Sequence, residues 1–219
     1  MGLSYAEENY LKAILKLSAP PDWTVSTNAI AAQLETSAAS VTDMLKKLSD
    51  KALITYLRYK GASLTDEGQR LATLLVRKHR LWEVFLVQSL GMTWDEVHEI
   101  AEELEHIQSE HLINRLDTFL GYPKFDPHGD PIPNAQGKYS VRAQIALSDL
   151  KEGQEGILIG VREDETGFLK HLNEKGLIPG KSLKVLSNDT YDHTLRLMVD
   201  DQELNLSGTV ARNIMIKPI

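Results

Sequence analysis

The 219-residue chain contains no cysteine. This absence excludes disulfide bonds and metal sites built on thiolates, and it fits a reducing compartment. No apolar run approaches the roughly 18 residues that a membrane span requires. The first residues also lack the basic-then-apolar pattern of a secretory signal. We therefore expect a cytoplasmic protein of ordinary globular composition that has no membrane partner.

The net charge of −7 is unevenly distributed along the chain. Residues 1–80 carry 11 Lys and Arg against 8 Asp and Glu, whereas residues 81–219 carry 13 against 23. A mildly basic first part joined to an acidic remainder is compatible with an N-terminal module that binds nucleic acid.

The first 65 residues have the pattern of a winged helix-turn-helix. Ser4-Tyr5-Ala6-Glu7 is a capping box that opens a helix ending before Ala19-Pro20-Pro21-Asp22. Two short amphipathic helices follow, from about Ser26 to Leu34 and from about Ser37 to Leu48. A strand at 53–59, a Lys60-Gly61 turn and a return at 62–65 complete the wing.

The second short helix is expected to enter the major groove of double-stranded DNA. Its first residues are small, which favours contacts to phosphates and thymine methyl groups and readout of DNA shape. The alternative is a solvated helix of a small bundle. The candidate DNA-contacting residues are Thr27, Ser37, Ala39, Ser40, Thr42, Asp43, Lys46 and Lys47, with Arg58 and Lys60 on the wing.

Two long helical patterns follow the wing. The first begins with Thr65-Asp66-Glu67-Gly68 and ends at Gly91; the second begins with Thr93-Trp94-Asp95-Glu96 and continues to about Leu120, before Gly121. On a helical projection of the second, His98, Glu102, Glu105 and His106 fall on one stripe between an apolar face and a solvent face. The first helix carries His79 and Glu83, four residues apart. Imidazole and carboxylate ligands indicate a divalent metal site, although a run of glutamates is more often a solvated face.

From about residue 140 the pattern changes to short strands punctuated by glycine. The predicted strands are 141–145, 155–161, 183–186 and 195–199, with one short helix at 168–175. This pattern is typical of a small β-barrel of SH3 type. The fold class is therefore mainly α with a small β domain, and we expect domains at 1–73, 74–139 and 140–219.

Several of these segments together resemble the metal-dependent repressors typified by the diphtheria toxin repressor and the manganese transport regulators. The segments are 8–14, 40–44, 64–68, 77–81, 104–106, 127–133 and the Leu177-Ile178-Pro179-Gly180 stretch. The last of these is similar to the SH3-like, FeoA-like domain of the longer members. The resemblance implies a homodimer that binds a palindromic operator and represses metal-uptake genes when metal is abundant.

The resemblance also implies two metal ions per subunit. One site would use His79, Glu83 and His98, with Glu165 or its neighbour Asp164 as an acidic ligand. The other would use Glu102, Glu105 and His106, together with Asn9 from the first helix; there the family has Met or Asp, and Glu8 lies ~100° away around the helix. Asp126 stands where some members have Cys, and plain turn chemistry is the alternative for Asp126 and His128.

Hard oxygen ligands favour Mn(II), with Fe(II) as the close alternative. We expect a regulator that is not an enzyme and takes no small-molecule substrate. A dinuclear His and Glu site in a hydrolase and a metal-trafficking protein with an SH3-like adaptor are the rival classes. A hydrolase would act on esters or phosphates, and a trafficking protein would lack the salt-dependent DNA binding of a repressor.

Overall fold

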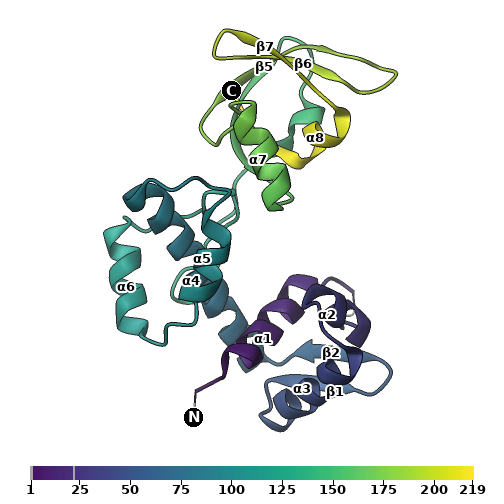
Figure 1. Ribbon diagram of the computed structural model, residues 1–219, viewed down its shortest axis with the longest axis vertical. Coiled ribbons are helices and arrows are strands. Elements are labelled where there is room, and N and C mark those ends of the chain that lie inside the picture. Colours follow the sequence, from purple (N-terminus) through teal and green to yellow (C-terminus); the bar gives the residue numbers. More distant parts are fainter. Residues whose placement is uncertain (1, 22) are drawn as a thin grey trace. The chain divides into compact units, whose positions relative to one another are not determined.

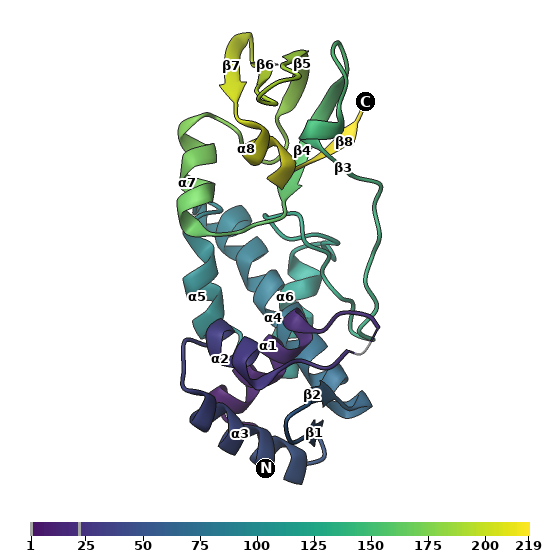
Figure 2. The same cartoon turned by 90° about the vertical axis from the view of Figure 1, so that its right-hand side faces the viewer.

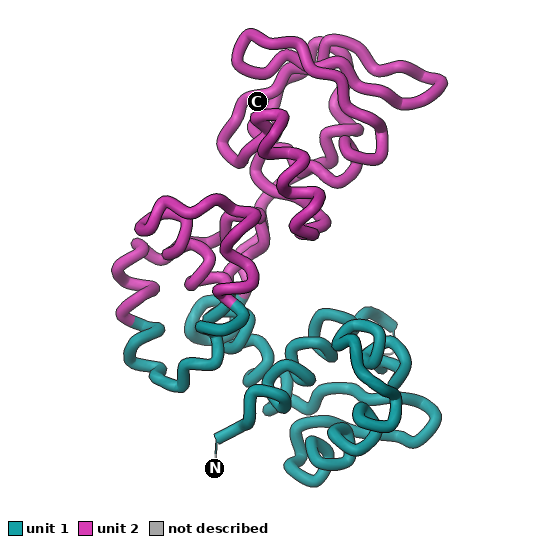
Figure 3. The backbone as a smooth tube through the Cα atoms, in the orientation of Figure 1, with its two compact units in different colours: residues 1–79, 102–114, 133–138 teal, residues 80–101, 115–132, 139–219 magenta. Residues whose placement is uncertain are grey.

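The computed structural model describes residues 2–21 and 23–219. The chain divides into two compact units whose segments alternate along the sequence (Figure 3). The first unit contains residues 1–79, 102–114 and 133–138, and the second contains residues 80–101, 115–132 and 139–219.

The first unit contains the predicted winged helix-turn-helix (Figure 1). Its elements are α1 (Tyr5–Leu17), α2 (Thr27–Gln33), α3 (Ala38–Asp50), β1 (Ile54–Leu57) and β2 (Gly61–Leu64). The predicted capping box is present, because Ser4 and Glu7 each accept a hydrogen bond from the other's backbone amide. The wing strands pair antiparallel from Ile54↔Leu64 to Leu57↔Gly61.

One apolar core holds this winged module together. Side chains from all three helices and from the wing contribute to it, and several are completely buried. The members with no exposed surface are Ile14, Ile30, Val41, Leu45, Leu48 and Ala62. Burial of each large aliphatic side chain stabilises the fold by about 1.5–3 kcal/mol. The apolar face of α3 is therefore held against α1 and α2, while its other face stays exposed.

The long helix α4 (Asp66–Leu90) begins in the first unit and continues into the second. It starts and ends as predicted. Thr65 Oγ1 accepts a hydrogen bond from the Gly68 amide at 3.1 Å, and Gly91 has a φ of +69° just after the last turn.

The prediction of one helix from residue 93 to 120 is wrong. The structure has α5 (Val97–Leu104) and α6 (Glu110–Phe119), separated by five non-helical residues. Glu105 and His106 form a turn after α5. Ser109 accepts a hydrogen bond from the Leu112 amide through Oγ at 3.3 Å, which starts a new helix there. The helical projection therefore does not apply beyond Leu104.

The second unit carries an antiparallel six-stranded sheet in the order β3-β8-β4-β5-β6-β7. Figure 2 shows α7 and α8 beside these strands. The elements are β3 (Ile145–Ala146), β4 (Glu155–Val161), α7 (Thr166–Glu174), β5 (Ser182–Asn188), β6 (Leu195–Val199), β7 (Gln202–Leu206), α8 (Gly208–Asn213) and β8 (Ile214–Pro218), with a short 3-10 helix η1 (Leu147–Asp149). The small SH3-like β domain predicted for the C-terminal part of the chain is confirmed.

The prediction of a strand at 141–145 is wrong for most of these residues. Only its last residue, Ile145, enters β3, and Val141 is 96% exposed. Arg142 instead contacts β4 and the 125–129 loop through its side chain: its guanidinium donates to the Gly129 and Ile159 carbonyls and lies 4.0 Å from the Phe125 ring centroid. Among the described residues, no helix is long and apolar enough to span a membrane.

Candidate metal centre

One face of α1 presents polar side chains toward residues 102–108 within the first unit. Glu8 and Lys12 are four residues apart and Asn9 lies between them, so all three fall near one side of the helix. The capping box at Ser4 fixes where the helix begins and therefore which residues take this side. Asn9 is the residue of this face that the sequence predicts as a ligand, and Glu8 is its neighbour.

Two glutamates and a histidine form a compact group opposite Lys12. His79 Nδ1 lies 2.7 Å from Glu105 Oε2 and 3.8 Å from Glu102 Oε1. Lys12 Nζ donates to Glu105 Oε2 at 2.6 Å and to Glu102 Oε1 at 2.7 Å. We call His79, Glu102 and Glu105 the carboxylate cluster. Three ligand atoms of this kind within a few ångströms are suited to one divalent cation.

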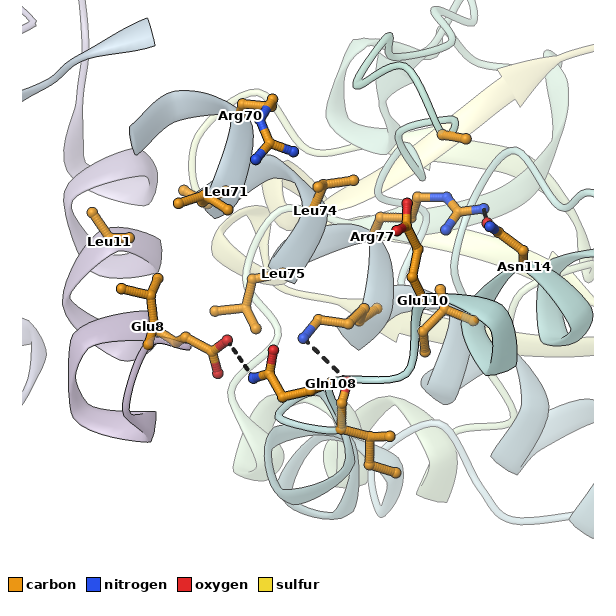
Figure 4. Close-up of a pocket in the computed structure, with 16 residues that line it drawn as sticks. Glu8, Leu11, Arg70, Leu71, Leu74, Leu75, Arg77, Gln108, Glu110 and Asn114 are labelled. Carbon is orange, nitrogen blue, oxygen red and sulfur yellow. Dashed lines mark hydrogen bonds between the residues drawn. The ribbon is translucent and has the colours of Figure 1, made fainter. Parts of the chain in front are cut away.

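His106 lies next to this cluster and is held by α1. Its Nδ1 is 2.6 Å from Glu8 Oε2, and its ring stacks on Tyr5 with centroids 4.4 Å apart. Gln108 Nε2 donates to the other oxygen of Glu8 at 2.8 Å (Figure 4). The same Glu8 and Gln108 line a cavity of about 260 Å³ whose wall includes Leu11, Leu71 and Leu75. Glu8, and not Asn9, is therefore the residue of α1 that contacts His106 directly.

Two buried oxygens around this group suit a cation. Asn9 Oδ1 and Glu105 Oε1 have no hydrogen-bond partner among the residues that the structure describes. Leaving a buried acceptor unpaired costs about 1–3 kcal/mol, and coordination of a metal would remove that cost. The Glu105 side chain is completely buried, and a buried carboxylate needs a positive partner. The donor set therefore fits a hard divalent metal ion.

A second group lies in the second unit around Glu83. Glu83 Oε1 is 3.4 Å from His98 Nδ1 and 3.5 Å from His128 Nδ1. Glu83, Asp126 and His128 are all buried and bring their ligand atoms together. Burial raises the pKa of Asp126 to about 7, and the Glu83 and Asp130 carboxylates act in the same direction. Burial alone would lower the pKa of His128, but Glu83 and Asp126 raise it to about 9.

Asp126 also has a structural role. Its Oδ1 accepts hydrogen bonds from the His128 and Asp130 amides, both at 2.9 Å, and its Oδ2 lies 3.3 Å from Arg80 Nε. These bonds are the turn chemistry that the sequence offered as the alternative to ligation. Glu165 is the exposed N-cap residue of α7 and belongs to no group of possible metal ligands found among the described residues.

Three features of these groups were missed by sequence analysis. His79 contacts Glu105, although it was assigned to a different site from Glu105. Lys12 was not selected, even though it follows Asn9 by three residues and so shares its side of the helix. His128 contacts Glu83, a pairing that the sequence did not predict. The helical spacing could have indicated Lys12, whereas the other two contacts join segments that are far apart in the sequence.

The candidate DNA-contacting residues lie on α2, α3 and the wing. Ser37 caps α3 by accepting from the Ser40 amide at 3.1 Å. Asp43 pairs with Lys46 at 3.1 Å, and Lys47 pairs with Glu7 of α1 at 3.2 Å. Thr27 and Thr42 are half-buried; the exposed members are Ser37, Ala39, Ser40, Asp43, Lys46, Lys47, Arg58 and Lys60.

Three family models match consecutive parts of the chain. Residues 2–62 match the iron-dependent repressor N-terminal DNA-binding domain, and residues 65–134 match the iron-dependent repressor metal-binding and dimerisation domain. Residues 145–218 match the FeoA domain. The class defined by fold and site is therefore a metal-dependent, DNA-binding repressor with a C-terminal SH3-like domain.

Individual relatives support the same assignment. The chain is 30% identical over 168 residues to the iron-dependent repressor IdeR of Mycobacterium leprae, a match that covers 71% of this chain and 73% of that repressor. It resembles a solved manganese-dependent transcriptional repressor in complex with manganese, with 32% identity, a TM-score of 0.80, and coverage of 97% of this chain and 100% of the other. A solved structure of ScaR with bound Zn²⁺ has 40% identity, a TM-score of 0.72, and coverage of 97% and 99%. The chain belongs to the iron- and manganese-dependent transcriptional repressor family, whose members are regulators rather than enzymes.

Proposed function

We propose that this chain is a cytoplasmic homodimeric repressor that binds a palindromic operator when Mn(II) is bound and thereby represses metal-uptake genes. The observation that carries the proposal is the polar contact between α1 and residues 102–108. Because α1 packs in the core of the winged module, any ion held there bears directly on the position of α3. In this role the protein acts as a regulator and not as an enzyme.

The first proposed site uses Asn9, Glu102, Glu105 and His106. The unpartnered oxygens Asn9 Oδ1 and Glu105 Oε1 support it, as does the burial of Glu105 and His106. Glu8 would orient His106, since a metal-bound imidazole usually donates its other N–H to a carboxylate.

The second proposed site uses His79, Glu83 and His98, with Glu165 as an acidic ligand from the C-terminal domain. Glu83 follows His79 by one turn of α4, which is the spacing of two ligands on one helix face. His98 Nδ1 is 3.4 Å from Glu83 Oε1. Glu165 and Asp126 are the weakest of the proposed ligands: Glu165 is exposed and belongs to no group of possible ligands among the described residues, and both oxygens of Asp126 already have partners. Two ions per subunit follow from these two sites.

The chemistry of the donors favours Mn(II), with Fe(II) as the close alternative. The first site offers carboxylate and amide oxygens and one imidazole, which are ligands for hard cations. The chain has no cysteine that would select softer metals. When bound, the ion supplies positive charge and a fixed coordination geometry. The chain's own residues then transmit its presence, because Asn9 belongs to the helix that supports α3.

The dimer is supported by apolar side chains that remain exposed in the second unit. Phe119 is 69% exposed and its ring packs against Phe85 at a centroid distance of 6.2 Å, and Leu90 is 60% exposed. The matched family model for residues 65–134 describes a dimerisation domain. The two winged modules of a dimer with a two-fold axis would each contact one half of a palindromic operator.

The Glu105→Gln substitution tests the first site. It keeps the shape of the side chain but removes the negative charge that a metal needs, so we expect the Mn(II)-dependent affinity for DNA to fall at least tenfold. The duplex would first be selected from random sequences with the Mn(II)-loaded wild-type protein, and affinity would then be measured by fluorescence anisotropy.

The matched control is Glu103→Gln, because Glu103 is an exposed residue of α5 in neither proposed site. It should respond to Mn(II) like the wild type. A Glu105→Gln variant that retains the full Mn(II) response would show that this cluster does not govern DNA binding.

A further inference from the structure

Lys12 lies among the groups that the proposed function gives to a metal ion. Its ammonium nitrogen is 2.6 Å from Glu105 Oε2, 2.7 Å from Glu102 Oε1 and 3.3 Å from His79 Nδ1. The Lys12 side chain is 18% exposed and that of Glu105 is completely buried, so the contact between these two is shielded from solvent. A cation carried by α1 thus contacts every member of the carboxylate cluster.

An ammonium and a metal ion cannot share these same two oxygens. Metal–oxygen bonds are about 2.0–2.6 Å long, close to the 2.6 and 2.7 Å that separate Lys12 Nζ from Glu105 Oε2 and Glu102 Oε1. An ion that took the place of the ammonium on these two oxygens would therefore clash with Lys12 Nζ. Their repulsion would also be strong, because like charges at such distances interact much more strongly in a partly buried site than in water. As long as Lys12 stays in place, this side of the cluster is closed to a metal.

The other side of Glu105 is arranged differently. Its Oε1 has no partner among the described residues, and the same holds for Asn9 Oδ1. Asn9 precedes Lys12 by three residues, so α1 presents the amide and the ammonium on neighbouring parts of one face. One carboxylate, Glu105, therefore offers one oxygen to Lys12 and keeps the other for a different cation.

We propose that Lys12 is a resident cation that takes the place of a metal ion in the carboxylate cluster, so that Glu102 and Glu105, together with Asn9 and His106, hold the one divalent ion of the first proposed site and no second ion binds between these two glutamates. This inference rests on the proposed function, since it concerns the same metal centre. Lys12 thereby sets how many ions the centre accepts, and it weakens the binding of the ion that does enter by adding a positive charge beside it.

The test compares metal binding by four full-length proteins: the wild type, Lys12→Glu, Lys12→Arg and Lys16→Gln. Bound Mn(II) is counted after equilibrium dialysis, and spin coupling between neighbouring ions is followed by electron paramagnetic resonance. Lys12→Glu replaces the ammonium with a ligand, so we expect one additional Mn(II) per chain and the spectrum of a coupled pair. Lys12→Arg keeps the charge and should bind as many ions as the wild type.

Lys16 is an exposed residue of the same helix, and Lys16→Gln controls for a general loss of positive charge. A Lys12→Gln variant adds an affinity measurement that does not depend on a new ligand; its Mn(II) dissociation constant should fall at least tenfold. Unchanged stoichiometry in Lys12→Glu, together with a Lys12→Gln affinity equal to that of Lys16→Gln, would overturn the inference while leaving the proposed function intact. Mn(II) binding by none of these proteins would overturn both.

Discussion

The buried carboxylate of Glu7 both caps α1 and pairs with lysines at the C-terminal end of α3. It accepts a hydrogen bond from the Ser4 amide at 2.8 Å and pairs with Lys51 at 2.6 Å and Lys47 at 3.2 Å. Burial alone would raise the pKa of Glu7, but Lys51, the Ser4 amide and Lys47 outweigh it and lower the pKa to about 2. Glu7 therefore stabilises the winged module by binding fewer protons in the folded state than in the unfolded state.

We expect Glu7→Gln to lower the free energy of unfolding at neutral pH by about 1–3 kcal/mol. Because the folded pKa lies below the ordinary value of 4.5, this contribution is fully present above pH 4.5 and is lost as the pH falls toward 2. Urea unfolding of metal-free protein from pH 7 to pH 3 measures it. Glu152→Gln, at an exposed position, is the control; a difference between wild type and Glu7→Gln that does not shrink below pH 4.5 would refute this account.

The chemistry of single residues could be predicted from sequence more reliably than their partners. His79, Glu102, Glu105 and His106 were selected by residue type and spacing, and the structure brings all four into contact with one another or with α1. For Lys12 the helical spacing could indicate only that it shares a side of α1 with Asn9; its contacts could not be predicted, because lysine is not a metal ligand and its glutamate partners are about 90 residues away. Which of these residues bind metal stays a prediction.

At the scale of elements, local signals were sufficient for most helix ends marked by a cap or a glycine, although the capping box predicted at 93–96 precedes a helix that begins only at Val97. Ser4, Ser26, Ser37 and Thr65 all accept the capping hydrogen bond that sequence analysis expects at a helix start. The turn at 105–109 was missed, because the apolar spacing continues across it and Ser109 is the only local signal. The β3–β8 pairing was also beyond sequence analysis, since it joins strands about 70 residues apart.

The exposed cations of α3 and the wing lead to a prediction about salt. Arg58→Ala and Lys46→Ala should each weaken DNA binding about equally for all sequences and reduce the slope of log affinity against log salt by about 1. Anisotropy titrations at several salt concentrations measure this slope. Lys170→Ala, on the exposed surface of α7, should leave it unchanged; an identical slope in Arg58→Ala would exclude the wing from the DNA interface.

At the scale of the whole molecule, the proposed dimer would form through apolar side chains that stay exposed in one subunit, such as Phe119. Phe119→Glu would place a charge in the proposed interface, so we expect the dimer dissociation constant to rise at least tenfold. Sedimentation equilibrium of the metal-free and Mn(II)-loaded protein measures this constant. Val141 is 96% exposed and lies outside residues 65–134, so Val141→Glu is the control. Equal dissociation constants for both variants would place the interface elsewhere.

The central claim is that a divalent metal governs DNA binding, and coupling of this kind must be reciprocal. The most direct measurement is the anisotropy of a selected duplex titrated with the wild-type protein at fixed salt, once with Mn(II) and once with chelator. The account predicts at least tenfold tighter binding with Mn(II), and an equal gain in Mn(II) affinity when the duplex is present. Equal DNA affinity in Mn(II) and in chelator would contradict it.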